Sequence, residues 1–269
     1  MNQNSENIKK NPHKVPPVFI SWHRKEYIRM IKEYAKRKVR LTITLITSLV
    51  FLKNLKWYPD FLLQKSGIAL LSSRTATLYR IIDLIESFEG DVAECGVYRG
   101  NTLLGMAVKI LRRDSNIRIF GLDSFEGLPD PSIEDRLKDG KMYEGALKGM
   151  FSDTSYNELL MKISLWGFSD NVRLVKGFFN NTLEQLSDRK FQLVHIDVDL
   201  YQSYKECLNF FYPRLVPGGY IVLDEYGHEN TFPGAKKAVE EFFSDKPEKP
   251  QYYDNEKENS RRYFIVKQI

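Results

Sequence analysis

Carboxylate side chains follow four of the buried strands that we expect in this sequence. Glu94 ends the first of these strands, Asp123 the second, Asp197 the fourth, and the pair Asp224-Glu225 the fifth. The carboxyl ends of parallel strands meet at one edge of a sheet, and ligands bind outside that edge. Buried acids are costly unless they are paired or bound to a cation. The sequence therefore predicts a ligand or metal site at this edge.

Asp197 and the pair Asp224-Glu225 are expected on neighbouring strands, with no cationic side chain close to them in sequence. Three carboxylate oxygens that meet at one point suit Mg²⁺, and Asp197 is then the best candidate for a general base. Turn or helix capping stays open as an alternative for the pair. Asp199 is a candidate cap for the helix that begins near Tyr201.

Residues 91–102, DVAECGVYRGNT, predict a buried strand, a glycine turn and the start of a helix. Gly96 allows the turn and a close approach by a ligand. Glu94, directly before the turn, suits a ligand with a cationic group, such as the amino group of S-adenosylmethionine. Asp123 suits two ribose hydroxyls, or else it caps the turn that follows it. The chain lacks G-x-G-x-x-G at this turn, which argues against an NAD-dependent oxidoreductase.

Strands and helices alternate along the chain, which predicts a doubly wound α/β fold around a parallel sheet. We expect a helix over 72–88, strands over 91–95, 117–122, 172–176, 191–196 and 219–223, and helices over 102–113, 155–167, 180–187, 202–212 and 234–243. Residues 250–254 and 262–267 fit an antiparallel pair at one sheet edge. The long, charged segment 129–155 contains three glycines and predicts a mobile lid over the site.

The composition bounds the remaining questions. The 269 residues carry a formal net charge of +5 and include four His and two Cys, which form neither a soft-metal pattern nor a disulfide framework. A reducing, cytoplasmic location is therefore expected. His195 fits a packed or hydrogen-bonded strand position better than a catalytic base, and Cys95 fits a small residue at a strand end better than a nucleophile.

The N-terminal part differs from the rest of the chain. We divide the sequence into a disordered arm over 1–20, a helical extension over 21–70 and a main domain over 71–269. The basic and apolar stretch 24–52 suits peripheral contact with an anionic membrane surface. Packing on the main domain or on a second subunit is the alternative. Its apolar run, 41–52, is too short to span a bilayer.

The chain resembles the macrocin O-methyltransferase family, which methylates sugar hydroxyls in macrolide and aminocoumarin antibiotics. The matching segments lie in family order between residues 70 and 245: AECGVYRG, LDSFEGLP, VKGFFNNTL, HIDVDLY, YPRLVPGGYIVLDEYG and PGAKKAVEEFF. The resemblance implies a class I methyltransferase (Rossmann-like) fold with a mostly parallel, seven-stranded sheet and an antiparallel edge. It also implies S-adenosylmethionine as the methyl donor and a divalent metal, usually Mg²⁺.

The resemblance also assigns site residues. It implies a cofactor site at Glu94, Cys95, Gly96, Val97, Tyr98, Gly100, Asp123, Ser124 and Phe125, and a metal site at Asp197, Asp224 and Glu225. The chain departs from the family in two places. It has Glu225 where the family commonly has Asp, which can shift the metal or change its affinity. It has Asn181 where the family often has Asp, which removes any acidic role there.

These features predict a Mg²⁺-assisted O-methyltransferase that acts on a sugar or glycosylated small molecule with vicinal hydroxyls. We expect a homo-oligomer and no nucleic-acid partner, because no basic and aromatic platform is visible in the sequence. One alternative is a noncatalytic methyltransferase-like protein. Such a protein could lose the carboxylates at the strand ends, whereas this chain retains them. The other is a membrane-surface protein in a polysaccharide or natural-product pathway, resting on residues 24–52.

Overall fold

The computed structural model describes residues 75–114, 116–228, 230–253 and 262–268. The expected arm over 1–20 and the expected helical extension over 21–70 lie outside these described residues, as does the membrane-contact stretch 24–52. No helix in the described ranges combines the length and the apolar character that crossing a bilayer requires.

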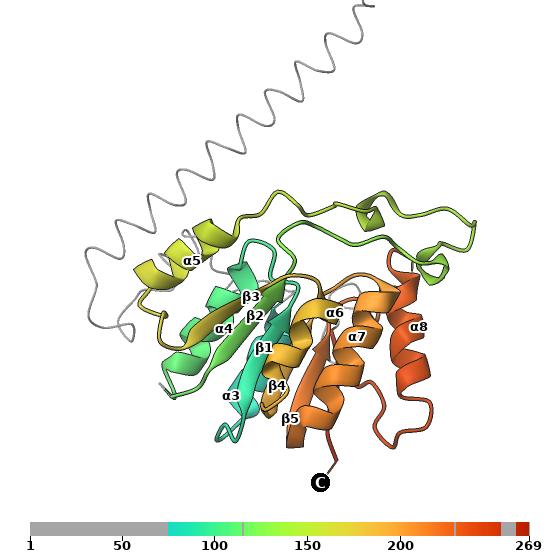
Figure 1. The fold of residues 1–269 in the computed structure, drawn as a ribbon. Helices are drawn as coiled ribbons and strands as arrows, with labels where there is room; N and C mark the ends of the chain where they lie inside the picture. Colours follow the sequence, from blue (N-terminus) through green and yellow to red (C-terminus); the bar gives the residue numbers. More distant parts are fainter. Residues whose placement is uncertain (1–74, 115, 229, 254–261, 269) are drawn as a thin grey trace, which may run out of the picture. The chain divides into compact units, whose positions relative to one another are not determined.

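A single mixed sheet of six strands organises the described residues, in the order β3-β2-β1-β4-β5-β6 (Figure 1). The strands are β1 (Asp91–Cys95), β2 (Ile119–Asp123), β3 (Val172–Lys176), β4 (Phe191–Ile196), β5 (Leu215–Leu223) and β6 (Tyr263–Val266). The first five are parallel and β6 pairs with β5 in antiparallel fashion. The strand order reverses between β1 and β4, and such a switch point is where open α/β sheets bind ligands.

The doubly wound fold is confirmed, but the predicted strand over 250–254 is wrong for the residues that the structure describes. Gln251 forms a single antiparallel bridge with Phe264 of β6, and residues 252 and 253 add no further pairing. Pro250 has no backbone N–H to contribute to a ladder. The described part of this sheet therefore has six strands instead of seven, with one residue pair marking the place of a seventh.

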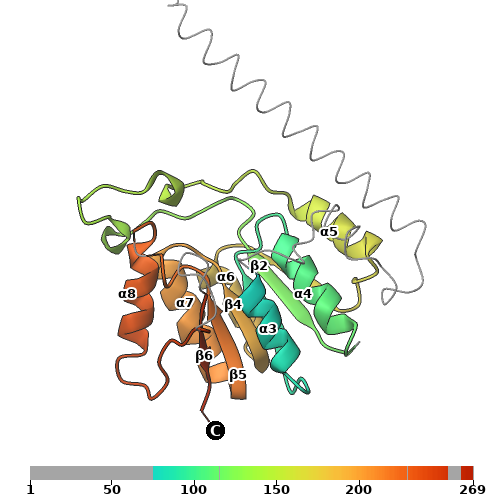
Figure 2. The ribbon, with the colours of Figure 1, turned by 180° about the vertical axis from the view of Figure 1, so that it is seen from behind.

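Helices cover both faces of the sheet. The helices α3 (Ala76–Leu84), α4 (Asn101–Leu111) and α5 (Tyr156–Leu165) share one core with Val92, Leu193 and Val222 (Figure 2). The helices α7 (Tyr201–Phe211) and α8 (Pro233–Phe242) share the opposite core with Ala93 and Val194, together with the short α6 (Phe179–Thr182). Successive strand residues point to opposite faces, so each buried strand supplies both cores, as its nearly continuous apolar sequence predicts.

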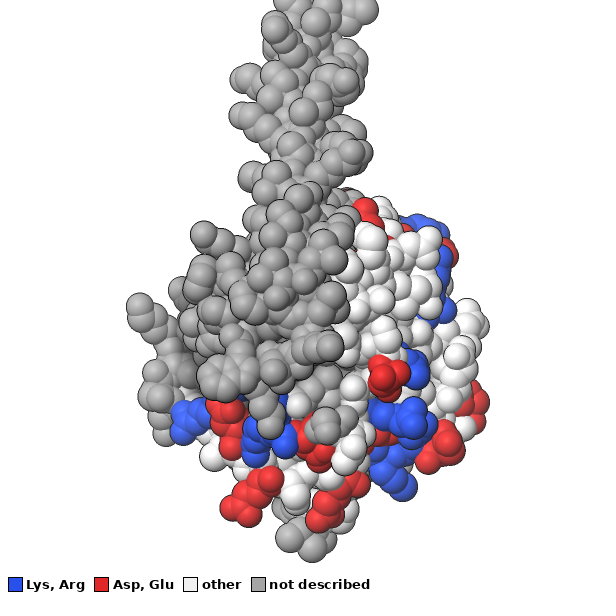
Figure 3. All heavy atoms as spheres, turned by 90° about the vertical axis from the view of Figure 1, so that its left-hand side faces the viewer, with Lys and Arg blue, Asp and Glu red and all other residues white. Residues whose placement is uncertain are grey.

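Both ribbon views show the segment between β2 and α5 crossing the edge of the sheet where the parallel strands end. This segment contains two short 3-10 helices, Ile133–Asp135 and Glu144–Ala146. The charged side chains in the face of Figure 3 are of mixed sign, with Lys and Arg next to Asp and Glu over its lower described part. That distribution is typical of a solvated surface.

Candidate functional site

The turn after β1 is shaped by two glycines. Gly96 has φ +82°, and a Cβ there would lie 1.7 Å from the carbonyl oxygen of Asp197, at the end of the neighbouring strand. Gly100 has φ +78°, and a Cβ there would lie 2.2 Å from Leu159 of α5. A side chain at Gly96 would push the turn away from β4, and both positions have the positive φ that favours glycine. The two glycines therefore keep the end of β1 close to Asp197.

Asp123 ties two loops together at the end of β2. Its Oδ2 accepts a hydrogen bond from the N–H of Tyr98 (2.8 Å), and its Oδ1 accepts one from the N–H of Phe125 (2.7 Å). Both donors belong to residues with positive φ, +48° and +56°. Burial raises the pKa of Asp123, while the backbone donors oppose that rise. The capping role is thus present, and each oxygen retains acceptor capacity for a ligand hydroxyl.

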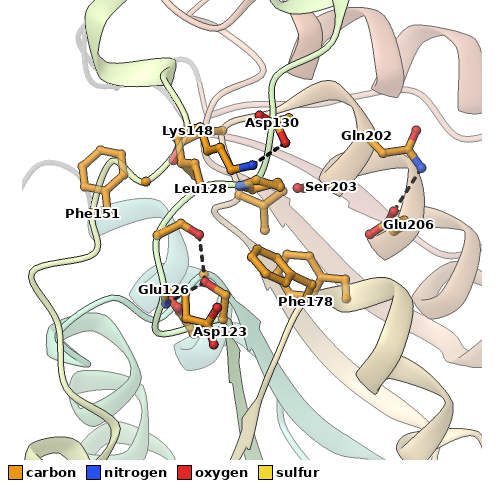
Figure 4. A pocket seen from close by; sticks show the side chains of 18 of the residues that line it. Asp123, Glu126, Leu128, Asp130, Lys148, Phe151, Phe178, Gln202, Ser203 and Glu206 are labelled. Atoms are coloured by element: carbon orange, nitrogen blue, oxygen red, sulfur yellow. Dashed lines mark hydrogen bonds and ion pairs between the residues drawn. The ribbon is translucent and has the colours of Figure 1, made fainter.

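A cavity of about 940 Å³ opens at the carboxyl ends of the parallel strands (Figure 4). Its wall includes residues from the turns after β1, β2, β3 and β4. Residues of the overlying segment between Glu126 and Phe151 form a further part of the wall. Five of the predicted site residues line it: Gly96, Tyr98, Asp123, Ser124 and Asp197. The predicted lid therefore lies over the site; its mobility stays a prediction.

The other predicted site residues lie behind the cavity wall. Cys95 and Val97 belong to the two cores, Gly100 starts α4, and Phe125 packs edge-to-face on Tyr156. Glu94, Asp224 and Glu225 are buried and do not line the cavity. The sequence motifs around β1 and β2 therefore identify the segments that border the cavity. Within each segment, only some of the side chains face the cavity, because successive strand residues point to opposite faces.

Carboxylate oxygens converge around Asp197. One group joins Asp197 with Asp199 and Glu225, and a second joins it with His195 and Asp224; within each group the ligating atoms lie within 4.8 Å of one another. Asp197 therefore links the three predicted metal ligands. Burial, and then the charges of Asp197 and Asp224, raise the pKa of Glu225 well above its usual range. Because like charges repel, a divalent cation at this cluster would favour the ionised form of Glu225.

A buried polar row crosses the sheet beside this cluster. Glu94 Oε1 lies 3.0 Å from His195 Nδ1, His195 Nε2 lies 3.6 Å from Asp224 Oδ1, and Arg262 Nε donates to Asp224 Oδ1 at 2.6 Å. Burial opposes charge on His195, yet its hydrogen bonds to Asp224 and Glu94 raise its pKa to about 10. His195 thus occupies the hydrogen-bonded strand position that its sequence context favours.

Asp224 is paired with a cation that lies far from it in sequence. Arg262 is 2% exposed and reaches Asp224 because β6 runs antiparallel beside β5, which brings residues 38 apart in sequence together. Glu94 retains one carboxylate oxygen, Oε2, that is buried without a hydrogen-bond partner among the described residues. Because Glu94 is 1% exposed and does not line the cavity, its contact with a cationic group of a ligand stays a prediction.

Two further contacts shape this end of the site, and sequence reasoning missed both. The hydroxyl of Tyr204, fully buried in α7, lies 2.6 Å from Glu225 Oε2. Asp135, in the segment over the cavity, accepts the N–H of Tyr201 at 2.8 Å, so it caps α7 instead of Asp199. Asp199 itself has φ +60°. The position of Tyr204 on the buried face of α7 could have been predicted from the helical periodicity of the sequence. The contact of Asp135 could not, because it joins residues 66 apart.

Comparison with known proteins gives a consistent result. The family model described as Macrocin-O-methyltransferase (TylF) matches residues 67–249. A 4'-O-methyltransferase of Streptomyces olivaceus that acts on 8-demethyl-8-(2,3-dimethoxy-alpha-L-rhamnosyl)-tetracenomycin C is 30% identical over 145 residues, 53% of this chain and 55% of that protein. The mycinamicin III 3''-O-methyltransferase of Micromonospora griseorubida is 30% identical over 168 residues, 59% of this chain and 62% of that protein. The matched region thus spans less than two thirds of either relative.

Among solved structures, the O-methyltransferase NovP superposes with a TM-score of 0.56 at 26% sequence identity, covering 71% of this chain and 79% of NovP. The matched family segment, 67–249, includes β1 to β5 and every predicted site residue. The sheet and its ligand-binding edge are therefore the features that these proteins share with this chain.

Proposed function

Because the chain belongs to the macrocin O-methyltransferase family, we propose that it transfers a methyl group from S-adenosylmethionine to a hydroxyl of a sugar or glycosylated small molecule. The observation that carries this proposal is that one cavity has Asp123 and Gly96 at one part of its wall and Asp197 at another. A donor bound at the first part and an acceptor at the second would meet at the switch point between β1 and β4.

The residues at the donor end fit S-adenosylmethionine, which supplies an activated methyl group on a sulfonium. Asp123 is fixed by two backbone donors, so its carboxylate is pre-oriented for the ribose hydroxyls. Gly96 lets the ligand approach the backbone closely. Glu94 lies behind the cavity wall, where its Oε1 pairs with His195, so it supports the turn at Gly96 from behind. Asp123 and Gly96 bind and orient the donor, and alignment of two reactants supplies several kcal/mol of catalysis.

Asp197 is the general base in this proposal. It lines the cavity and is partly exposed, whereas Asp224 and Glu225 are buried behind it. Of the three acids, Asp197 is thus the one that an acceptor hydroxyl can contact. Its carboxylate would take the hydroxyl proton as the acceptor oxygen attacks the methyl group. Tyr204 and Arg262 hold the two buried acids in place.

The cluster also fits a divalent metal, which would be held by Asp197, Asp224 and Glu225. When bound, Mg²⁺ would lower the pKa of a coordinated hydroxyl and fix two adjacent hydroxyls. The proposal is supported by the carboxylate oxygens around Asp197, although Glu225 groups with Asp197 and Asp199 whereas Asp224 groups with Asp197 and His195. Arg262 and His195 both lie beside Asp224, so Asp197 and Glu225 are the acids on which the proposed metal depends most.

The Asp123→Ala variant should bind S-adenosylhomocysteine more weakly by about 1–3 kcal/mol, because ribose hydroxyls would lose their acceptor. Isothermal titration calorimetry of the wild type and the variant measures this difference. Asp139→Ala is the matched control, since it removes one exposed acid outside the cavity wall. Equal affinity of all three proteins would remove Asp123 from the donor site, and NAD binding in place of S-adenosylhomocysteine would overturn the proposed donor.

A further inference from the structure

The cavity extends beyond Asp197 to a pair of polar side chains on α7. Gln202 and Glu206 are one helical turn apart, both line the cavity, and the Gln202 side-chain amide donates to Glu206 Oε1 at 3.0 Å. Figure 4 shows this pair on the opposite side of the cavity from Phe151, and away from Asp123. The pair therefore lies away from the donor end of the cavity. An acceptor would be held on this side.

The pair has the hydrogen-bonding capacity that a sugar requires. The amide of Gln202 offers a second N–H donor and a carbonyl acceptor, and Glu206 offers a second carboxylate oxygen. Each hydroxyl of a sugar ring is both donor and acceptor, so two adjacent hydroxyls can bind an amide and a carboxylate that lie side by side. Because Gln202 is exposed and Glu206 only partly buried, both groups are accessible from the cavity.

An aromatic pair also lines the cavity. The rings of Tyr143, in the overlying segment, and Phe232, directly before α8, meet edge-to-face at a centroid distance of 5.6 Å, and both residues line the cavity. Aromatic rings bury large apolar areas with little loss of side-chain freedom, and the Tyr hydroxyl adds a polar tip. This combination suits a pyranose ring, which has one apolar C–H face and polar edges.

The charges of the described lining residues disfavour an anionic acceptor. The charged lining residues are the acids Asp123, Glu126, Asp130, Asp197, Asp199 and Glu206 and the single base Lys148. Lys148 is already paired with Asp130 at 2.6 Å. A nucleoside diphosphate would bring two or more negative charges close to these acids, and like charges at such distances repel.

We propose that Gln202, Glu206, Tyr143 and Phe232 form an acceptor-recognition wall that binds an uncharged pyranoside in preference to a nucleotide-linked sugar. This inference rests on the proposed function and deepens it by naming the substrate class and the residues that select it. The wall binds hydroxyls other than the one that receives the methyl group, since Asp197 faces that one.

Saturation-transfer difference NMR on the full chain, saturated with S-adenosylhomocysteine, tests the wall without requiring turnover. The probes are the methyl pyranosides of rhamnose, galactose, mannose and glucose, with dTDP-rhamnose as the anionic counterpart of the first. At least one methyl pyranoside should receive saturation, and methyl rhamnoside should receive more at its ring protons than the rhamnosyl ring of dTDP-rhamnose. Gln202→Ala and Tyr143→Ala should each lower the pyranoside signal at least fivefold.

Asn209→Ala is the matched control, because Asn209 is exposed on the same helix and does not line the cavity; it should leave the signal unchanged. Three results would overturn the wall: no saturation of any pyranoside, equal signals in all variants, or stronger saturation of the nucleotide-linked rhamnose. Binding that depends on the wall without methyl transfer would reject the proposed function alone. Methyl transfer that neither variant affects would reject the wall alone.

Discussion

The Asp197→Asn variant should turn over roughly 10²- to 10⁴-fold more slowly than the wild type, which is the range that general-base catalysis supplies. Asn is nearly isosteric with Asp but cannot take a proton from an acceptor hydroxyl. The variant also removes the carboxylate that links the two acidic groups around this position. Its affinity for S-adenosylhomocysteine should stay close to the wild-type value, because the donor end is built on β1 and β2.

Single-turnover measurement of methyl transfer, with calorimetry of donor binding, separates these two effects. Asp188→Asn is a suitable control, since Asp188 is 82% exposed in the turn before β4. Wild-type turnover in Asp197→Asn would exclude this residue as the base. Loss of donor binding together with turnover would instead mean that Asp197 supports the turn at Gly96, against which its carbonyl packs.

Removal of divalent metal should lower methyl transfer by roughly 10²-fold or more, because a metal acting on the acceptor supplies several kcal/mol. Burial, followed by the charges of Asp197 and Asp224, raises the pKa of Glu225, and a divalent cation would oppose that rise. The measurement is turnover before and after EDTA treatment, followed by addition of Mg²⁺.

Addition of Mg²⁺ should restore turnover, while EDTA should leave the affinity for S-adenosylhomocysteine unchanged. Full activity in excess EDTA would contradict the metal and would leave Asp197 as a metal-free base. Protection of the protein from thermal unfolding by Mg²⁺ gives an independent readout of metal binding, and Glu225→Gln should abolish that protection.

The parallel sheet could be predicted from sequence because its strands are short apolar runs separated by helical periods. Parallel strands are buried on both faces, so β4, FQLVHI, is buried at every position. The acids that end these strands also marked the correct edge. The prediction of a seventh strand was wrong because the sequence of residues 250–254 resembles that of β6, whereas Gln251 alone among the described residues of this segment pairs with β6.

Contacts between distant residues could not be predicted. Arg262 neutralises Asp224 from the adjacent antiparallel strand, and Asp135 caps α7 from a loop 66 residues earlier. Neither contact leaves a periodic or local pattern, because both depend on how loops fold over the sheet edge. Glu94 illustrates a further limit: it sits in the right motif, but its side chain faces His195 behind the cavity wall.

The central claim is methyl transfer to a sugar hydroxyl, and the most direct measurement uses S-adenosylmethionine labelled in its methyl group. The full chain is incubated with this donor, Mg²⁺ and the small-molecule extract of the source organism, and the products are analysed by tandem mass spectrometry. The account predicts a labelled methoxy group on a sugar ring, formed by the wild type and lost in Asp197→Asn. Label that stays entirely in the donor, or that reaches only nitrogen or protein, would contradict the account.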